Sequence, residues 1–563
     1  MAEVRKAMSW HPRSGRSGHS GVRARTLAWV VAIGLVVPAA ASAQAGAPPP
    51  TFAELEAAGT KIGEIRIRNR DIFDLDDPKE NNALFRLANK LHIQTRSSVI
   101  ARSVLFKSGD PVSANVIEET ERVLRSVRYL YWARISPAAV HDGVVDVDVE
   151  TRDTWSLSPN VSFGRSGGEN TTSVRITEYN LLGTGVLLDF GRSNTVDRSS
   201  NELLIRNDRA FDGWTSIRLN HATNSDGKRN EGAVDHPFFS LDTRWAAGAS
   251  ASDDDRIDSV YNAGEVVSQY RHRERKAEIY GGRSAGRVDG WVQRYSIGAT
   301  LQDDQYALDP ALPPPALLPS DERLVGPFVR YELIEDRYKT LVNRNQIQRP
   351  EAFALGVAAR AQLGWASTAW GSSRNALLYA ASVSAGFEAG ADKMLLASAT
   401  IDGQLSEGRI RRQTLSGALR FYLPQSKRWL FYAAASGDLL TNPAPLDELL
   451  LGGDNGLRGY PLRYQSGTRR ALFVFEERAY TDIYLWRLFR LGGAVFVDVG
   501  RAWGGDNQNT VNPDWLSDIG FGLRIFNVRS AFSNVLHLDI AFPINPDANI
   551  ERVQYLVKVK TSF

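Results

Sequence analysis

The sequence predicts an exported protein whose larger part is a transmembrane β-barrel, preceded by one small α/β domain. Three observations predict this fold class. The N-terminus has the pattern of a secretory signal, and residues 60–155 alternate between strand-like and helix-like segments. Residues 156–563 contain many alternating segments of about ten residues, separated by Gly, Asn, Asp and Pro. The mean hydropathy of −0.28 is low for a membrane protein. It is compatible with a membrane barrel, because such a barrel has an apolar belt outside and a polar lumen inside.

Composition narrows the functional classes. The chain has 563 residues with 67 basic and 64 acidic side chains, and its formal net charge of +3 lacks the basic excess typical of nucleic-acid binders. Cysteine is absent, which excludes disulfides, thiol catalysis and cysteine-ligated metal centres. The eight histidines are scattered without metal-ligand spacing. We therefore expect no nucleic acid, no metal and no other cofactor.

Residues 1–43 predict a secretory signal peptide. Two arginines precede the apolar stretch 27–37, and small residues at 41–43 provide a cleavage site. The apolar stretch is too short to cross a bilayer comfortably as a helix, and an uncleaved N-terminal anchor is the alternative. Residues 44–59 are interpreted as a leader or linker that contains at most a short helix.

Residues 60–155 predict a small α/β domain. Residues 62–68 alternate apolar and polar side chains as a strand does, and Asp110-Pro111 opens an amphipathic helix with proline in a favoured first-turn position. Residues 144–150 alternate valine with acidic residues after a hairpin, which indicates a strand with one apolar and one solvated face. The predicted order is strand, helices, strand, strand, which many small exported domains share.

The barrel prediction rests on alternation along residues 156–563. No segment there has a convincing helical period, and the alternating segments number roughly 16 to 20. Lipid cannot form hydrogen bonds with the unpaired N–H and C=O groups of a free strand edge, so the sheet must close on itself or nearly so. The clearest segments are residues 174–180, 186–191, 214–222, 291–301, 376–387 and 429–435.

The last strand shows the alternation most clearly. One parity is apolar and is expected to face lipid, whereas the other carries glutamine and lysine and is expected to face the lumen. A terminal phenylalanine after such alternation resembles the C-terminal signal read by the bacterial outer-membrane insertion machinery. The residues that carry this signal are Tyr555, Val557, Val559 and Phe563.

Short motifs follow one another in the last quarter of the chain. A long loop, residues 441–469, carries the sequence Leu457, Arg458, Gly459, Tyr460. Strand-like segments then carry Glu-Glu-Arg at 476–478, Phe-Val-Asp-Val-Gly at 496–500 and Gly-Phe-Gly-Leu-Arg at 520–524. In this order, and followed by the terminal phenylalanine, these motifs resemble the signatures of the BamA/TamA superfamily. Members of that family are outer-membrane barrels with periplasmic POTRA (polypeptide-transport-associated) domains.

The resemblance implies a specific architecture. Residues 60–155 would be a single POTRA domain, and the barrel would have 16 antiparallel strands. The loop 441–469 would fold back into the barrel, where Arg458 would pair with acids on the inner wall. The planar guanidinium group of arginine can make bidentate contacts with a carboxylate. The alternation of side chains along the strands independently places the charged wall residues on the lumen side. The expected lumen residues are Glu476, Asp498, Gly500, Gly520, Gly522 and Arg524.

The resemblance also implies a function. The protein is expected to insert or translocate protein clients at the outer membrane without acting as an enzyme. Unpaired backbone groups are costly in lipid, so the first strand, about residues 156–164, and the last, residues 553–563, are expected to form a weak seam. Expected partners are outer-membrane lipids, unfolded or β-strand protein clients, and a periplasmic protein that docks on the POTRA domain by strand addition.

Other functions stay open at this point. A two-partner-secretion translocator would export one dedicated substrate, but that family has a plug helix and two POTRA domains. An outer-membrane phospholipase or esterase is the enzymatic alternative, because Ser166 and Ser284 each lie in a G-x-S-x-G sequence. A nucleophile elbow requires a helix after the serine, and neither sequence is followed by one. A diffusion porin would need neither the N-terminal domain nor the loop motif.

Three further segments are interpreted as loops or turns. Residues 253–255 are three consecutive aspartates, predicted to be a solvated turn because they lack a calcium-binding pattern. Residues 271–276 are predicted to be a basic turn near anionic lipid headgroups. The Pro-rich residues 309–319 are predicted to form a long external loop.

Overall fold

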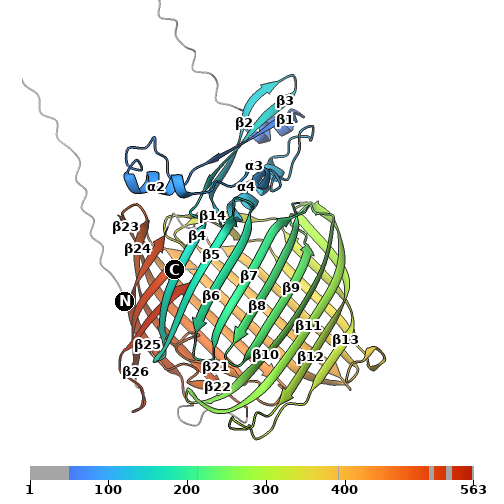
Figure 1. Cartoon of the computed structure of the whole chain (residues 1–563), viewed down its shortest axis with the longest axis vertical. Coiled ribbons are helices and arrows are strands. Elements are labelled where there is room, and N and C mark those ends of the chain that lie inside the picture. The colour runs from blue at the N-terminus through green and yellow to red at the C-terminus, as the bar shows by residue number, and fades with distance from the viewer. Residues whose placement is uncertain are drawn as a thin grey trace, which may run out of the picture. The chain divides into compact units, whose positions relative to one another are not determined.

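The computed structural model describes residues 50–211, 213–390, 392–505, 513–527, 535–544 and 546–560 (Figure 1). The expected signal peptide, the beginning of the leader and Phe563 lie outside the described residues. Among the residues described, no helix is both long and apolar enough to cross a membrane.

The described chain begins with a small domain of helices and strands. Its elements are α1 (Phe52–Ala57), β1 (Lys61–Arg70), α2 (Ala83–Leu91), α3 (Ser97–Ala101), α4 (Ala114–Ser126), β2 (Leu130–His141) and β3 (Val144–Asp153). The sheet order is β1-β3-β2, with β1 parallel and β2 antiparallel to β3. Three of the four valines of β3, Val145, Val147 and Val149, are fully buried in one apolar cluster. Leu55 of α1 packs into the same cluster, so this helix is part of the domain core.

Twenty antiparallel strands follow and close into a barrel, in which β27 meets β4. Two short hairpins do not join the ring: β14 (Tyr338–Val342) with β15 (Pro350–Ala354), and β21 (Leu449–Leu451) with β22 (Gln465–Gly467). The barrel strands are β4 (Leu157–Ser166), β5 (Glu169–Leu181), β6 (Val186–Asn194), β7 (Ser199–Ala210), β8 (Thr215–Asn224), β9 (Gly227–His236), β10 (Trp245–Asn262), β11 (Glu265–Val288), β12 (Trp291–Ala307), β13 (Glu322–Glu335), β16 (Ala358–Ala366), β17 (Ala376–Glu388), β18 (Met394–Ser406), β19 (Arg409–Pro424), β20 (Trp429–Thr441), β23 (Arg469–Leu485), β24 (Phe489–Trp503), β25 (Leu516–Asn527), β26 (Val535–Ile544) and β27 (Gln554–Lys560).

The strand number of 16 implied by the family resemblance is therefore wrong, since the closed ring has 20 strands. Strand number is set by closure and stagger of the whole ring, which no local sequence pattern reports. Local alternation is also weak on some strands. On β10 the outward positions Ala247, Ala249 and Ala251 are small, so they give little hydrophobic signal.

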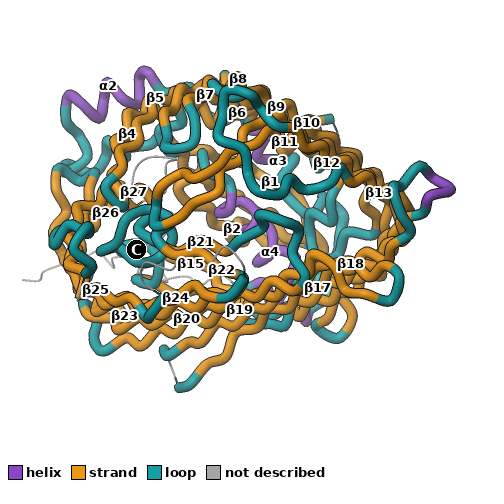
Figure 2. Tube along the Cα trace, turned by 90° about the horizontal axis from the view of Figure 1, so that it is seen from below, coloured by secondary structure: helices purple, strands orange, loops and turns teal. Residues whose placement is uncertain are grey.

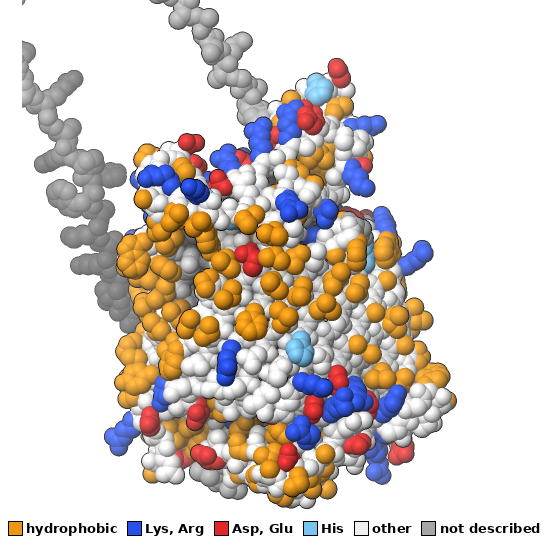
Figure 3. All heavy atoms as spheres, viewed as in Figure 1, with side chains coloured by type: hydrophobic (Ala, Val, Ile, Leu, Met, Phe, Trp, Pro, Cys, Tyr) orange, Lys and Arg blue, Asp and Glu red, His pale blue; other side chains and the backbone are white. Residues whose placement is uncertain are grey.

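Apolar side chains cover the outside of the wall. Val161 is 81% exposed, Ile297 66% and Phe190 58%, although all three lie within strands. Figure 3 shows a broad orange band of hydrophobic side chains across the strands, with charged side chains gathered below it. An apolar exterior around a polar interior is the arrangement of a transmembrane barrel.

The two charge runs that were predicted to be turns lie instead within paired strands, so those predictions are wrong. Residues 253–255 are in β10 and residues 271–276 are in β11. Asp253 accepts two hydrogen bonds from Arg273, at 2.9 and 2.7 Å. Opposite charges on neighbouring strands stabilise the pairing of those strands. Neither charged segment predicts this pairing when it is considered by itself. β11 has 24 residues, more than twice the 9–11 that cross a bilayer, so its charged half extends beyond the apolar band.

The two ends of the barrel differ in their connections. We call the end at which β4 begins, directly after the N-terminal domain, the proximal end, and the other the distal end. The longest proximal connection is residues 336–357, which carries the β14–β15 hairpin. The distal end has long loops at 308–321, where the Pro-rich stretch lies as predicted, and at 442–468. Figure 2 shows β15, β21 and β22 inside the ring of barrel strands.

Candidate functional site: the inward loop and the seam

The distal loop 442–468, which we call the inward loop, folds into the lumen. The β21–β22 pair closes its base. Its Leu457 and Tyr460 are 0% and 1% exposed and join a buried apolar cluster with Leu516 of the wall. The Tyr460 hydroxyl also donates to the backbone carbonyl of Ser517 at 3.1 Å. The loop is therefore seated against the wall by packing at several points.

Arg458 is the polar anchor of the inward loop. Its Nε and Nη2 donate to the two carboxylate oxygens of Asp498, each at 2.7 Å, and its Nη1 donates to Glu476 Oε1 at 2.8 Å. The guanidinium lies 3.3 Å from the ring centroid of Phe496. All of these residues are buried. The structure thus brings the loop arginine and the two acids of the sequence motifs into one bidentate, charge-assisted contact.

A third acid on the wall was not predicted from the sequence. Asp518 lies opposite Asp498 across β24 and β25, and its Oδ2 accepts the Gly459 N–H at 2.9 Å. A Cβ on Gly459 would lie 2.6 Å from Asp518 Cβ and 3.0 Å from the backbone nitrogen of Pro543. Only glycine allows this close approach of the loop to the wall. The signal that could have identified Asp518 is its parity, because it shares a strand face with Gly520.

Arg524 and Asp539 form a neighbouring buried ion pair. Arg524 is 0% exposed, and its Nη1 donates to Asp539 Oδ1 across β25 and β26. Gly522 makes room for this pair, because a Cβ there would collide with the Asp539 carboxylate. Gly520 makes room for the Phe496 ring in the same way. Asp539 was not among the predicted site residues, since its role depends on the strand that pairs with β25.

Glu476 links the loop arginine to a second arginine, Arg478. Glu476 Oε2 accepts from Arg478 Nε at 2.8 Å while its Oε1 accepts from Arg458. Arg478 belongs to the Glu-Glu-Arg motif but was not predicted as a site residue. Gly500 has a packing role, because a Cβ there would lie 3.0 Å from Leu451 Cδ2.

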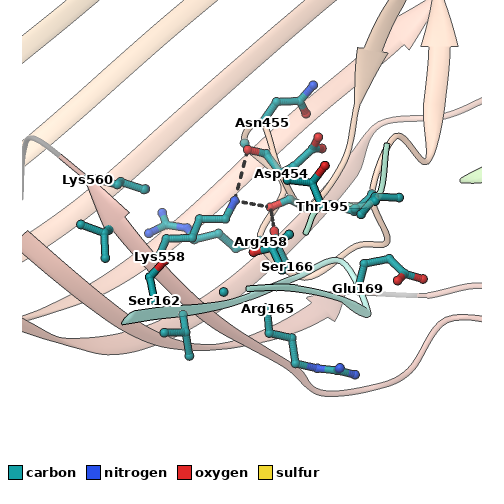
Figure 4. A pocket seen from close by; sticks show the side chains of 18 of the residues that line it. Ser162, Arg165, Ser166, Glu169, Thr195, Asp454, Asn455, Arg458, Lys558 and Lys560 are labelled. Atoms are coloured by element: carbon teal, nitrogen blue, oxygen red, sulfur yellow. Dashed lines mark hydrogen bonds between the residues drawn. The ribbon is translucent and has the colours of Figure 1, made fainter. Parts of the chain in front are cut away.

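β4 and β27 meet at a seam that is only weakly paired. Within the described part of β27, Val557 and Arg165 are the single pair of Cα partners, whereas β4 pairs with β5 along its whole length. The inward loop bridges this seam (Figure 4). The Gly453 carbonyl oxygen accepts from Ser166 Oγ on β4 at 2.5 Å and from Lys558 Nζ on β27 at 2.7 Å. The seam is therefore held by the loop as well as by its own ladder.

A cavity of about 730 Å³ opens beside the seam. Its lining includes the charged residues Arg458, Glu476 and Lys558. On β27, Tyr555 is 57% exposed, and Val557 and Val559 share its face of the strand. The inward face of the same strand contributes its lysines to the cavity.

The candidate esterase serines have structural partners. Ser166 Oγ donates to the Gly453 carbonyl, and Ser284 Oγ donates to the carbonyl of Gln293 at 2.7 Å. Both serines lie in strands rather than in a strand-to-helix turn. A nucleophile needs an adjacent base, and the contacts of these two hydroxyls are with backbone. In the part of the chain that is described, no group of three His, Asp or Glu side chains is arranged to hold a metal.

Comparisons with known proteins found matches among solved structures. No protein-family model and no curated protein matches it. Among solved structures it is similar to BamA from Haemophilus ducreyi lacking POTRA domains 1–3, at 14% identity, 88% coverage of this chain, 84% of that chain and a TM-score of 0.39. It is also similar to CdiB from Acinetobacter baumannii and CdiB from Escherichia coli, each at 12% identity, 89% coverage of this chain and a TM-score of 0.44, covering 73% and 76% of those chains.

Proposed function

We propose that this protein is an outer-membrane barrel that inserts or translocates protein clients. The closed ring with its apolar exterior supports the membrane location. Apart from residues 336–357, the proximal connections are short, and the longest loop, 442–468, is distal; short periplasmic turns and longer external loops are typical of such barrels, which supports a periplasmic proximal end. The N-terminal domain would then act in the periplasm as a POTRA-like domain. Its edge strand β1 is paired with residues 109–112 only at its beginning, and the edge beyond Ile62 is where a client or partner strand can add.

The observation that carries this proposal is the seam between β4 and β27. Each unpaired backbone group in lipid costs several kcal/mol, so a barrel opens most readily where its ladder has the fewest pairs. The seam has one described pair of Cα partners and is bridged by the inward loop. When the loop moves, both edges become available to a client strand. The buried contact of Arg458 with Asp498 sets the resting position of the loop.

A second candidate function is translocation of one dedicated substrate through the lumen. The observation in its favour is that two separate inserts, the inward loop and the β14–β15 hairpin, occupy the lumen. Such inserts suit a conduit that is closed at rest. The seam and the lumen are compatible routes, because a client that enters the lumen can leave through the seam.

Photo-crosslinking in living cells tests the proposal. A photoreactive phenylalanine analogue is placed at Val557 on the seam, and as a control at Val383 on the outer face of the continuous β17–β18 ladder. We expect adducts with newly exported proteins from position 557 and none from position 383. Equal adducts at both positions, or none at either, would overturn the proposal.

A further inference from the structure

The β14–β15 hairpin is an insert that the barrel wall does not need. It leaves the wall between β13 and β16, which pair directly with each other up to Ile334 and Ala358. Its own two strands pair only with each other, from Tyr338–Ala354 to Val342–Pro350. Removing the hairpin would thus leave the ring of strands complete, so its presence calls for a separate explanation.

Apolar packing holds the hairpin against the inner wall. Ile347 at its tip is 0% exposed, and it lies in one buried cluster with Leu341 and Phe353 of the hairpin. Burying one such side chain contributes about 1.5–3 kcal/mol, so the hairpin is seated rather than loose. The cluster extends over inward-facing residues from β18 round to β26. These wall residues are Met394, Tyr422, Leu430, Tyr480, Ala494, Phe526 and Val535.

Two wall side chains bind the main chain of the tip, whereas a third, the Tyr422 hydroxyl, donates to the Asn345 side chain at 3.0 Å. The backbone carbonyl of Arg344 accepts from Arg478 Nη1 at 3.1 Å and from the Tyr480 hydroxyl at 3.0 Å. Both donors come from β23 and both are buried. Every residue of any polypeptide carries a carbonyl, so these donors can bind an extended chain of any sequence. If the hairpin left, the buried donors would need a replacement acceptor.

The hairpin and the inward loop share one carboxylate. Arg478, which binds the hairpin carbonyl, also donates to Glu476 Oε2, while Arg458 of the inward loop donates to Glu476 Oε1. A continuous buried chain of hydrogen bonds therefore runs from the hairpin tip to the residue that seats the inward loop. A change at either insert changes the partners of Glu476.

The tip itself has a conformation that depends on its contacts. Gln348 has a φ of 55°, a left-handed conformation that costs a non-glycine residue about 1–2 kcal/mol. The Glu351 carboxylate holds the turn by accepting the N–H groups of Arg344 and Asn345 at 3.2 and 3.0 Å. Such strain persists only because the surrounding contacts hold the tip in its seat.

We propose that residues 336–357 are a plug at the proximal end, seated on an inner-wall surface that binds extended polypeptide backbone. The donors of this surface are Arg478 and Tyr480, with Tyr422 beside them. A client chain takes the surface when the hairpin leaves it. The client part rests on the proposed function, whereas the plug is measurable without any client.

Conductance in planar bilayers tests the plug. Residues 338–354 are replaced by Asn-Gly, which joins β13 to β16 through a tight turn, and the matched control shortens the distal loop 308–321. We expect the hairpin deletion to raise single-channel conductance several-fold and the control to leave it unchanged. Unchanged conductance in a correctly folded deletion variant, or an equal rise in the control, would overturn the plug.

A reversible cross-link in the full-length chain tests the plug even if the deletion variant does not fold. The chain has no cysteine, and Asn343 Nδ2 lies 3.5 Å from the carbonyl of Lys427 in the proximal β19–β20 turn. Asn343→Cys with Lys427→Cys, joined by a short thiol cross-linker that a reductant cleaves, fixes the hairpin in its seat. We expect the cross-linked barrel to lose all spontaneous opening events and the reduced barrel to regain them. Opening events that persist under complete cross-linking would overturn the plug.

The backbone-binding surface has its own test. A reduced and alkylated, unfolded polypeptide is added to the hairpin-deleted barrel, and current blockades are recorded. We expect Tyr480→Phe to shorten the blockades several-fold, whereas Tyr555→Phe on the lipid face leaves them unchanged. Equal blockade lifetimes in all three barrels would overturn the surface. Because this readout uses no cellular client, its failure is distinguishable from a failure of the proposed function, which would appear only in the photo-crosslinking.

Discussion

Ser166 and Lys558, from the two strands that flank the seam, donate hydrogen bonds to the same atom, the carbonyl oxygen of Gly453. That carbonyl belongs to the inward loop, which Arg458 fixes to the wall. The two edges of the barrel are thus joined through a third segment. This arrangement makes the position of the loop and the state of the seam mutually dependent.

Loss of the lysine should loosen the seam. Lys558→Met removes the hydrogen bond from the Lys558 ammonium group to Gly453, a charged contact worth about 1.5–3 kcal/mol. We expect faster amide hydrogen exchange in β4 and β27 and unchanged exchange in β17. Lys560→Met is the matched control, because it removes the same charge from the same face of β27. Equal acceleration in both variants would mean that charge, and not the bridge to the loop, holds the seam.

Removal of the loop arginine should strongly destabilise the barrel. Arg458→Met leaves the carboxylates of Asp498 and Glu476 buried without their partner, and breaking a buried ion pair costs about 3–5 kcal/mol. The free energy of unfolding in detergent, from urea titration, measures the loss. Adding Asp498→Asn to Arg458→Met should recover part of it, because one of the unpaired charges is then removed. A loss below about 1 kcal/mol, the size expected for an exposed pair, contradicts this account.

The loop should not tolerate a side chain at Gly459. Gly459→Ala places a Cβ 2.6 Å from Asp518 Cβ, which forces the loop away from the wall. We expect a loss of about 1–3 kcal/mol in the free energy of unfolding, as for other overpacked sites. Gly437→Ala on β20 is the control, since its Cβ would meet only Arg470 O at an ordinary 3.7 Å. If both variants unfold at the same urea concentration, the close approach at Gly459 is unimportant.

A charge on the outer wall should hinder folding into lipid. Ile297→Arg on β12 puts a guanidinium into the apolar band, at a cost of about 2–4 kcal/mol near the bilayer midplane. Leu317→Arg in the distal loop 308–321 is the control, because Leu317 is similarly exposed, at 62% against 66% for Ile297. Tryptophan fluorescence during urea-driven folding into vesicles reports the free energy. An equal effect of both changes would argue against a lipid-facing position for Ile297.

Local patterns predicted the features that depend on a single strand. Parity along residues 496–500 places Asp498 on the lumen side, and parity along 554–560 separates the lysines from the lipid-facing residues. The order of elements in the N-terminal domain also follows from local alternation. Because side chains on a strand alternate strictly, one segment suffices for such inferences.

The features that the sequence did not predict depend on which strands are neighbours. Two of the three aspartates at 253–255, Asp253 and Asp255, lie opposite arginines of β11, which stabilises the acidic run in a strand. Asp518 and Asp539 acquire their roles from β24 and from Arg524. The number of strands and the hairpin that folds into the lumen are likewise consequences of the closed ring, which is a non-local property.

Closing the seam covalently tests the central claim most directly. Arg165→Cys with Val557→Cys joins the two facing residues of β4 and β27 by a disulfide in an otherwise cysteine-free chain. Val383→Cys with Ala399→Cys places the same bond in the continuous β17–β18 ladder as a control. We predict that the oxidised seam pair stops assembly of the clients captured at position 557, that a reductant restores it, and that the control pair has no effect. Undiminished client assembly with the seam fully cross-linked would contradict the account.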